Sequence, residues 1–296
     1  MELKGKTALV LGAVKGIGRA IGIALAKEGV NLALTRYDWK ESFDSMELAF
    51  ADSGAKACLG GQDCSGSGTG GACKADFGFD YEIYDVNLLD VEQIKQLKNR
   101  IEERFGKIDI LINNIERGGW PAVHGEYVEE QWELEMATTL RAKRWVFNQM
   151  LPLLAKSNDA VVINFSSIAA IVGRSGPAAP IFNDGYSSAA RGVSLLTETW
   201  ARVAAPYIRV NEIMLGIFES RHAQGTRGWE TVLTDEEKRA IVDHTLIGRT
   251  GTLDDVIKAV LFIIKDAPYM TGSILRLDGG YVLGGEKVPP MPIGVL

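Results

Sequence analysis

The sequence has little of what marks secreted, membrane-embedded and nucleic-acid-binding proteins. Only three of its 296 residues are cysteine, too few for a disulfide-stapled fold. No run approaches the roughly 18 apolar residues of a membrane span, and no signal peptide precedes the first predicted strand. Positive charge is not in excess: the net charge of −6 disfavours nucleic acid and anionic membranes as partners. We expect a cytoplasmic protein.

The remaining composition is that of a globular protein, with 46% hydrophobic and 24% charged residues. Runs that are apolar on both faces, as in buried parallel strands, alternate with segments of helical periodicity. The expected strands are 7–11, 31–35, 108–112, 160–165, 208–214 and 273–277, and the expected helices are 17–27, 91–105, 131–154, 187–203 and 254–264. Because each parallel return needs a crossover, this order predicts an α/β fold: a Rossmann-type doubly wound parallel sheet, with residues 1–296 as a single domain.

A glycine-rich insertion interrupts this alternation at about residues 58–76. Six of the twelve residues from 60 to 71 are glycine, so the insertion offers few side chains to bury and is expected to be a flexible excursion or a contact surface for a partner. Cys58, Cys64 and Cys73 flank or lie within it. Their spacing matches no zinc pattern, so we expect free thiols and no metal site.

The C-terminal tail, residues 285–296, is predicted to be extended. Pro289, Pro290 and Pro292 prevent a helix there. Because the tail remains apolar, we expect it to lie against another surface.

Gly12, Gly16 and Gly18, with Ile17 between the last two, follow the first predicted strand and open the first predicted helix. Such a turn presents free backbone N–H groups to a pyrophosphate. A merely tight strand-to-helix turn is the alternative interpretation. The position between a strand and a helix favours dinucleotide binding.

The spacing of these glycines resembles the short-chain dehydrogenase/reductase family, and the resemblance continues along essentially the whole chain. In order, the matching motifs are Asp85-Val86, which implies adenine contact; Asn113-Asn114; Asn164-Phe165-Ser166-Ser167; Tyr186; Ile208-Arg209-Val210-Asn211; and Thr271-Gly272 with Leu277 to Gly280. The resemblance implies an NAD or NADP cofactor and catalytic roles for Ser167 and Tyr186. Each of these two hydroxyls also has a plainer interpretation, as a cap of a strand end or a helix start.

The family's proton-transfer site needs a lysine four residues after the tyrosine, because its charge lowers the tyrosine pKa and its ammonium holds the nicotinamide ribose. Here Ala190 stands at that position. Arg191 follows it, but at about 100° per residue it points about 140° away from Tyr186. The catalytic pair therefore looks vestigial.

Further departures from the family pattern fall at cofactor and proton-relay positions. Glu116 replaces a glycine beside the nicotinamide path, and Thr139 aligns with the relay asparagine. Leu11 replaces the usual threonine before Gly12, and Leu215 replaces the proline before Gly216. Together with Ala190, these changes predict weak binding of NAD or NADP by this chain.

Arg36, at the end of the second predicted strand, leaves the cofactor type open. An acidic residue there would select the ribose 2′-hydroxyl of NAD, whereas arginine favours a 2′-phosphate. A solvated surface arginine is an equally good interpretation.

Two functions follow from these residues. The first is a non-catalytic or degenerate subunit of a heteromeric NAD-dependent hydroxyacyl-CoA-type dehydrogenase, expected to be a tetramer with an active family paralogue. The chain resembles the inactive subunits of heteromeric dehydrogenases that oxidise 2-(hydroxybenzyl)succinyl-CoA, which implies an acyl-CoA substrate. The second is an active NAD(P)-dependent alcohol dehydrogenase or ketoreductase with an atypical site.

Overall fold

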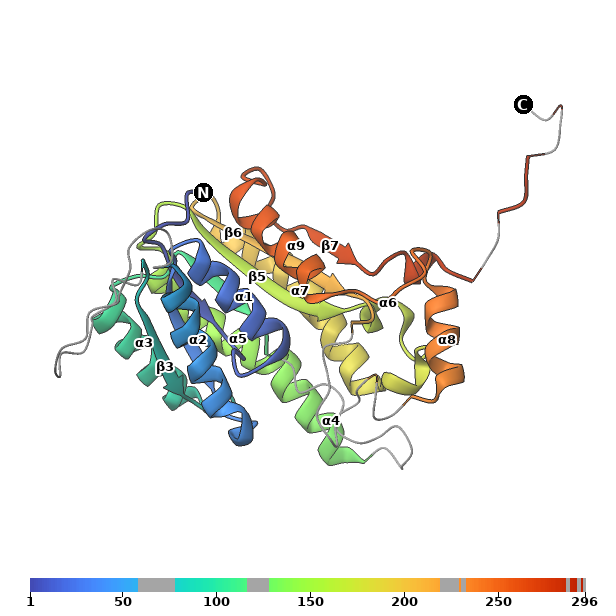
Figure 1. Ribbon diagram of the computed structural model, residues 1–296, viewed down its shortest axis with the longest axis horizontal. Coiled ribbons are helices and arrows are strands. Elements are labelled where there is room, and N and C mark those ends of the chain that lie inside the picture. The colour runs from blue at the N-terminus through green and yellow to red at the C-terminus, as the bar shows by residue number, and fades with distance from the viewer. Residues whose placement is uncertain are drawn as a thin grey trace, which may run out of the picture.

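The computed structural model describes residues 1–57, 78–115, 128–218, 229, 233–285, 288–291 and 294 (Figure 1). The glycine-rich insertion with its three cysteines, and Glu116, lie outside the described residues. No described helix has the length and apolar character needed to cross a bilayer.

Seven parallel strands form one sheet in the order β3-β2-β1-β4-β5-β6-β7. The strands are β1 (Thr7–Val10), β2 (Asn31–Arg36), β3 (Tyr81–Asp85), β4 (Ile110–Asn113), β5 (Ala160–Ser167), β6 (Ile208–Leu215) and β7 (Ile274–Leu277). The order reverses between β1 and β4, where the two doubly wound halves meet. The predicted Rossmann-type sheet is confirmed. Its carboxyl edge at this reversal is where such folds bind ligands.

Helices cover both faces of the sheet. The helices α1 (Gly16–Lys27), α2 (Phe43–Ala57) and α9 (Leu253–Lys265) enclose one apolar core, and α3 (Val91–Phe105), α5 (Ala142–Leu154) and α7 (Asp184–Ala204) enclose the other (Figure 1). The shorter elements are η1 (Lys40–Ser42), α4 (Glu129–Glu135), η2 (Met136–Arg141), α6 (Ala169–Val172), η3 (Ala179–Ile181), α8 (Asp235–His244) and η4 (Tyr281–Leu283).

The expected helix 131–154 is three consecutive elements. Between α4 and α5 the chain forms a π-helical segment, η2, that includes Thr139. π-Helical turns inside α-helices are frequent at functional sites. In this chain the turn sits against α7, with Leu140 packed on Gly192.

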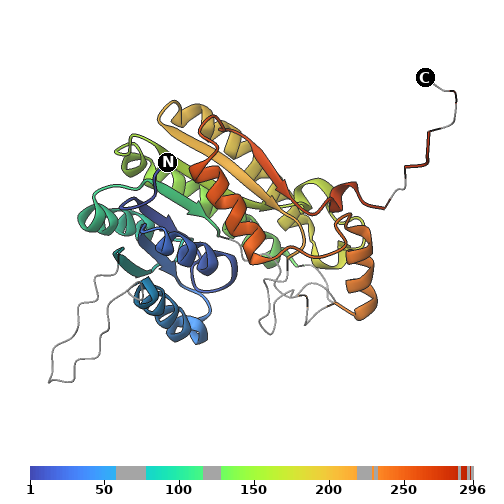
Figure 2. The ribbon, with the colours of Figure 1, turned by 45° about the horizontal axis from the view of Figure 1, so that its top comes forward.

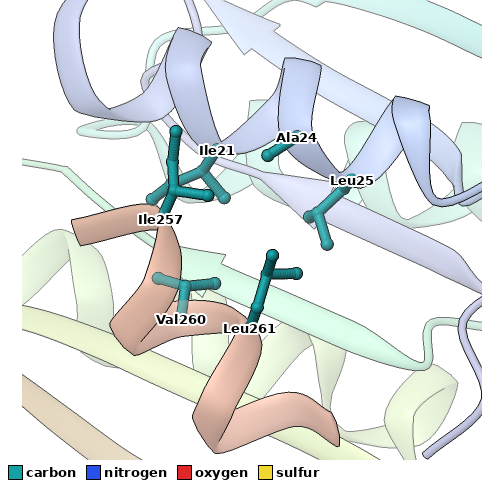
Figure 3. Close-up of a pocket in the computed structure, with 6 residues that line it drawn as sticks. All are labelled: Ile21, Ala24, Leu25, Ile257, Val260 and Leu261. Carbon is teal, nitrogen blue, oxygen red and sulfur yellow. The ribbon is translucent and has the colours of Figure 1, made fainter. Parts of the chain in front are cut away.

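Neither the C-terminal tail nor the depression between α1 and α9 forms a binding site within the described chain. The described part of the tail leaves the body of the molecule, with Val288 94% and Met291 74% exposed (Figure 2). These two side chains do not pack on the described part of this chain, and contact of the tail with another surface stays a prediction. The surface between α1 and α9 has only a slight depression with no room for a water molecule; it is lined by aliphatic side chains, including Ile21 and Val260, and reflects helix packing rather than a site (Figure 3).

Candidate functional site

The glycine turn after β1 is pressed against the end of β4. Gly12 and Gly16 have φ angles of +68° and +58°, which L side chains rarely adopt. A Cβ atom on Gly18 would lie 2.2 Å from the Gly12 carbonyl oxygen, and one on Gly12 would lie 2.6 Å from the Asn114 carbonyl oxygen. The Gly12 amide donates to Oγ1 of Thr35 across 3.1 Å. This close packing requires glycine at both positions.

The first turn of α1 leaves its backbone amides available to a ligand. Lys15 precedes the helix in extended conformation, and no side chain caps the helix start. Arg19 braces the turn by donating from Nε to the Val14 carbonyl across 2.7 Å. Ile17 is half-buried and packs on the adjacent core. A glycine turn with a free helix N-terminus fits the pyrophosphate of NAD or NADP, which these amides would hold.

At the carboxyl ends of β2 and β3, Arg36 is held by two carboxylates. Its Nε and Nη2 donate to Asp85 across 2.8 and 3.2 Å, and Nη1 donates to Glu47 across 2.6 Å. The hydrogen bond to Asp85 leads the causes that raise the pKa of Arg36. The Val86 amide donates to the Arg36 carbonyl, so the Asp85-Val86 pair lies directly beside Arg36. The expected adenine-side residues therefore come together.

A buried chain of polar side chains crosses the ends of β4 and β5. Nδ2 of Asn113 donates to Oδ1 of Asn164 across 3.0 Å, and Nδ2 of Asn164 donates to Oγ1 of Thr197 on α7 across 2.9 Å. All three side chains are buried. Asn113 thus lies inside the protein, where it fixes the β4 end against α7.

Ser167 and Tyr186 are placed as expected, at the end of β5 and in the first turn of α7, and both are buried. Oγ of Ser167 accepts a hydrogen bond from the Ala169 amide across 3.2 Å. This is the strand-end cap that the sequence offered as the alternative to a catalytic role. Tyr186 lies in one apolar cluster with Ile168 and Ala169. Tyr186 therefore packs against the two residues that directly follow Ser167 in the chain.

Ala190 is completely buried, whereas Arg191, the next residue, is exposed. Arg191 therefore points away from the face of α7 that carries Tyr186. Thr139 is also completely buried, and its hydroxyl has no hydrogen-bond partner among the described residues. A buried hydroxyl without a hydrogen-bond partner costs free energy of folding, so Thr139 leaves an unsatisfied polar group at the relay position.

Two buried ionisable residues, Lys143 and Glu212, escaped the sequence analysis. Lys143, on α5, is completely buried and donates from Nζ to the Ile115 carbonyl just after β4. Glu212, on β6, is also completely buried and accepts from Ser166 and Ser194. Burial raises the pKa of the Glu212 carboxyl, against the opposing effect of these hydroxyls. The sequence indicates such a buried charge only where a charged residue stands at an inward-facing position among apolar residues.

Comparison with known proteins agrees with this geometry. Residues 44–282 match the family profile described as enoyl-(acyl carrier protein) reductase. The chain is 30% identical over 285 residues to a 3-oxoacyl-(acyl-carrier-protein) reductase of Haemophilus influenzae, covering 95% of this chain and all of that one. The corresponding reductase of Thermotoga maritima is 27% identical over 287 residues, covering 96% of this chain and all of that one.

Among solved structures, the NADPH-dependent 3-quinuclidinone reductase of Rhodotorula rubra superposes with a TM-score of 0.76 at 23% identity, covering 95% of this chain and 93% of that one. At that identity the likeness shows the fold. The family membership rests on the profile match and on the reductase that is 30% identical. The chain therefore belongs to the short-chain dehydrogenase/reductase family of oxidoreductases.

Proposed function

We propose that this chain is a catalytically degenerate subunit of a heteromeric NAD-dependent dehydrogenase, supporting an active paralogue. The observation that carries the proposal is Ala190, a completely buried methyl group at the lysine position of the family. Without an ammonium there, Tyr186 loses the charge that would stabilise its phenolate. General acid–base catalysis contributes about 10²- to 10⁴-fold in rate, so the loss is severe.

Three further observations support the proposal. Arg191 is exposed and does not replace the missing ammonium. The Thr139 hydroxyl offers neither the length nor the amide of a relay asparagine. The hydroxyl of Ser167 is engaged by the Ala169 amide. The family lysine is thus absent and the relay asparagine is replaced by the shorter threonine, while Tyr186, Ser167 and the surrounding fold are retained.

The helices α5 and α7 are the surfaces through which we expect the partner to bind, since family members pair through these two helices. On α7, Leu195 and Val203 are 66% and 63% exposed. The proposed partner is an active family member in a hetero-oligomer, and the proposed substrate is a hydroxyacyl-CoA of the 2-(hydroxybenzyl)succinyl-CoA type. NAD or NADP would serve the complex through the active subunit.

The test is co-purification of tagged chain with an untagged partner, followed by assays of each component. We expect no turnover by this chain alone and full turnover by the complex, unchanged by Tyr186→Phe in this chain. Turnover by this chain purified free of any paralogue, and lost on Tyr186→Phe, would refute the degenerate-subunit proposal.

Lys143 favours a second candidate function, an active alcohol dehydrogenase or ketoreductase with an atypical site. Its buried ammonium reaches the Ile115 carbonyl, two residues beyond Asn113, so a cation lies at the end of β4 although position 190 of α7 carries none. Under this alternative, Lys143→Met would abolish turnover by the isolated chain and leave its fold intact by circular dichroism. Under the degenerate-subunit proposal there is no such turnover to lose.

A further inference from the structure

The guanidinium of Arg36 is already bound on two sides by negative charge. Asp85 accepts hydrogen bonds from Nε and Nη2 in a forked pair, and Glu47, from α2, accepts one from Nη1. The Phe43 ring covers one face of the group, with its centroid 4.3 Å from Cζ. Arg36 is only 17% exposed, while Glu47 and Asp85 are 56% and 64% exposed. A ligand approaching Arg36 from solvent therefore meets the carboxylates first.

Lys15, the residue that precedes α1, is a cation whose ammonium is also engaged. Nζ of Lys15 lies 3.1 Å from the centroid of the Trp39 ring. Trp39 is the non-glycine residue with positive φ in the described chain, at +66°, a conformation that costs free energy for a bulky side chain. Burial lowers the pKa of Lys15, and Glu41 acts on it in the opposite direction. Arg36 is thus paired with two carboxylates, Asp85 and Glu47, whereas Lys15 is engaged by the Trp39 ring.

We propose that Glu47, together with Asp85, makes the adenosine end of this site select a ribose with a free 2′-hydroxyl over one carrying a 2′-phosphate. A 2′-phosphate brings about −1.5 to −2 charges and must displace Glu47 from Arg36 or lie beside it. A 2′-hydroxyl instead donates to the Glu47 carboxylate and leaves the ion pairs intact. Although an arginine at this position favours NADP, the two neighbouring carboxylates shift the preference of the site to NAD.

Glu47 is the discriminating residue for a geometric reason. Asp85 lies on the neighbouring strand, directly opposite Arg36 in the parallel register, and holds it through two hydrogen bonds. Glu47 adds a single bond from a half-exposed position on a helix. Removal of its charge frees Nη1 toward solvent, while the forked pair with Asp85 remains.

The experiment is calorimetric titration of the full chain with ADP-ribose and with 2′-phospho-ADP-ribose. Both probes lack nicotinamide, so the result is independent of Ala190 and of turnover, and it can fail while the degenerate-subunit proposal stands. We expect wild type to bind ADP-ribose at least about tenfold more tightly. Glu47→Gln should bring the two affinities within about threefold, and Glu236→Gln on α8 should leave the ratio unchanged.

Salt provides a second readout, because exposed charges are screened. The wild-type preference should shrink between about 50 mM and 500 mM salt, whereas the Glu47→Gln ratio should move little. Equal or tighter wild-type binding of the phosphorylated probe would overturn the proposal, and so would an unchanged ratio in Glu47→Gln. Failure of both probes to bind the wild-type chain would overturn it as well.

Discussion

Oγ of Ser194 on α7 donates a hydrogen bond to Oε1 of Glu212 on β6 across 3.0 Å. The Ser166 hydroxyl donates to the same oxygen, and Oε2 of the carboxyl has no hydrogen-bond partner among the described residues. A carboxyl this deep is easier to bury in its neutral form. The sheet therefore contains a titratable group directly beneath α7.

The stability of the protein should consequently depend on Glu212 in a definite direction. Because its folded-state pKa is raised above the ordinary value of 4.5, the folded state binds the proton more strongly than the unfolded state does. The stability contributed by this proton is complete below about pH 4.5 and is lost as pH rises through the folded-state pKa. We expect the free energy of unfolding of Glu212→Gln, relative to wild type, to increase with rising pH, as measured by urea denaturation at several pH values.

Ser194→Ala is the matched variant for this prediction. It removes a hydrogen bond that stabilises the charged carboxylate, so the wild-type pH dependence should extend to higher pH instead of disappearing. Parallel stability curves for wild type and Glu212→Gln at all pH values would contradict the assignment.

Restoring the family lysine should not restore activity. Ala190→Lys places an ammonium on the Tyr186 face of α7 but leaves Thr139 in place of the relay asparagine and Glu116 in place of the glycine. Groups that act as a unit are strongly non-additive, so we expect no NADH-linked turnover from the single variant. The triple variant Glu116→Gly, Thr139→Asn, Ala190→Lys is the smallest change expected to gain cofactor binding.

Ala190→Met, which adds similar bulk without charge, is the control for packing effects on stability. Absorbance of NADH with a panel of hydroxyacyl thioesters and secondary alcohols is the readout. Turnover by Ala190→Lys alone, lost on addition of Tyr186→Phe, would show that the remaining departures are harmless.

Most of the sheet could be predicted from the sequence because its strands are buried on both faces. All eight residues of β5 and all eight of β6 are buried, and burial on both faces makes such strands largely apolar, although three of the eight β6 residues are polar or charged. Strand β3 was not recognised from periodicity, because it is half-exposed and mixes Tyr81 and Ile83 with Glu82 and Asp85. The helices α2, of 15 residues, and α8, of 10 residues, also lie outside the predicted elements, because neither segment has a clear apolar stripe at helical spacing.

The nucleotide-binding half of the site was predictable, whereas its charge partners were not. Glycine spacing encodes a local turn, so Gly12, Gly16 and Gly18 could be assigned directly. The partners of Arg36 come from β3 and α2, and no local pattern links them. Lys143 and Glu212 contradict the usual preference of charged residues for the surface, so periodicity assigns them no role.

The buried polar chain that ends at Thr197 should be worth measurable stability. Thr197→Val keeps the shape but removes the acceptor for Nδ2 of Asn164, leaving a buried donor unsatisfied. We expect a loss of about 1–3 kcal/mol in the free energy of unfolding. Thr199→Val is the control: its hydroxyl donates to the Leu195 carbonyl on the exposed face of α7, and the change should stay within about 0.5 kcal/mol. An equal loss of stability in the two variants would show that the hydrogen bonds linking Asn113, Asn164 and Thr197 do not stabilise the fold.

The glycine turn should tolerate no side chain at Gly18. Gly18→Ala forces a Cβ atom against the Gly12 carbonyl and the Asn114 side chain, and we expect about 1–3 kcal/mol of destabilisation with weakened ADP-ribose binding. Gly78→Ala is the control, since a Cβ atom there meets nothing within 4 Å. Thermal unfolding of both variants measures the difference, and an unchanged midpoint in Gly18→Ala would mean that the turn can open.

The strand order also governs how the chain can fold during synthesis. The β1-β2-β3 half joins the β4-to-β7 half only through β1 and β4 of the described sheet, whose paired residues, such as Ala8 and Ile110, are about a hundred positions apart. Until β4 leaves the ribosome, the inner edge of β1 is an unpaired apolar strand, the kind of edge that recruits other chains. The nascent protein is therefore most exposed to aggregation during the interval between the synthesis of β1 and that of β4.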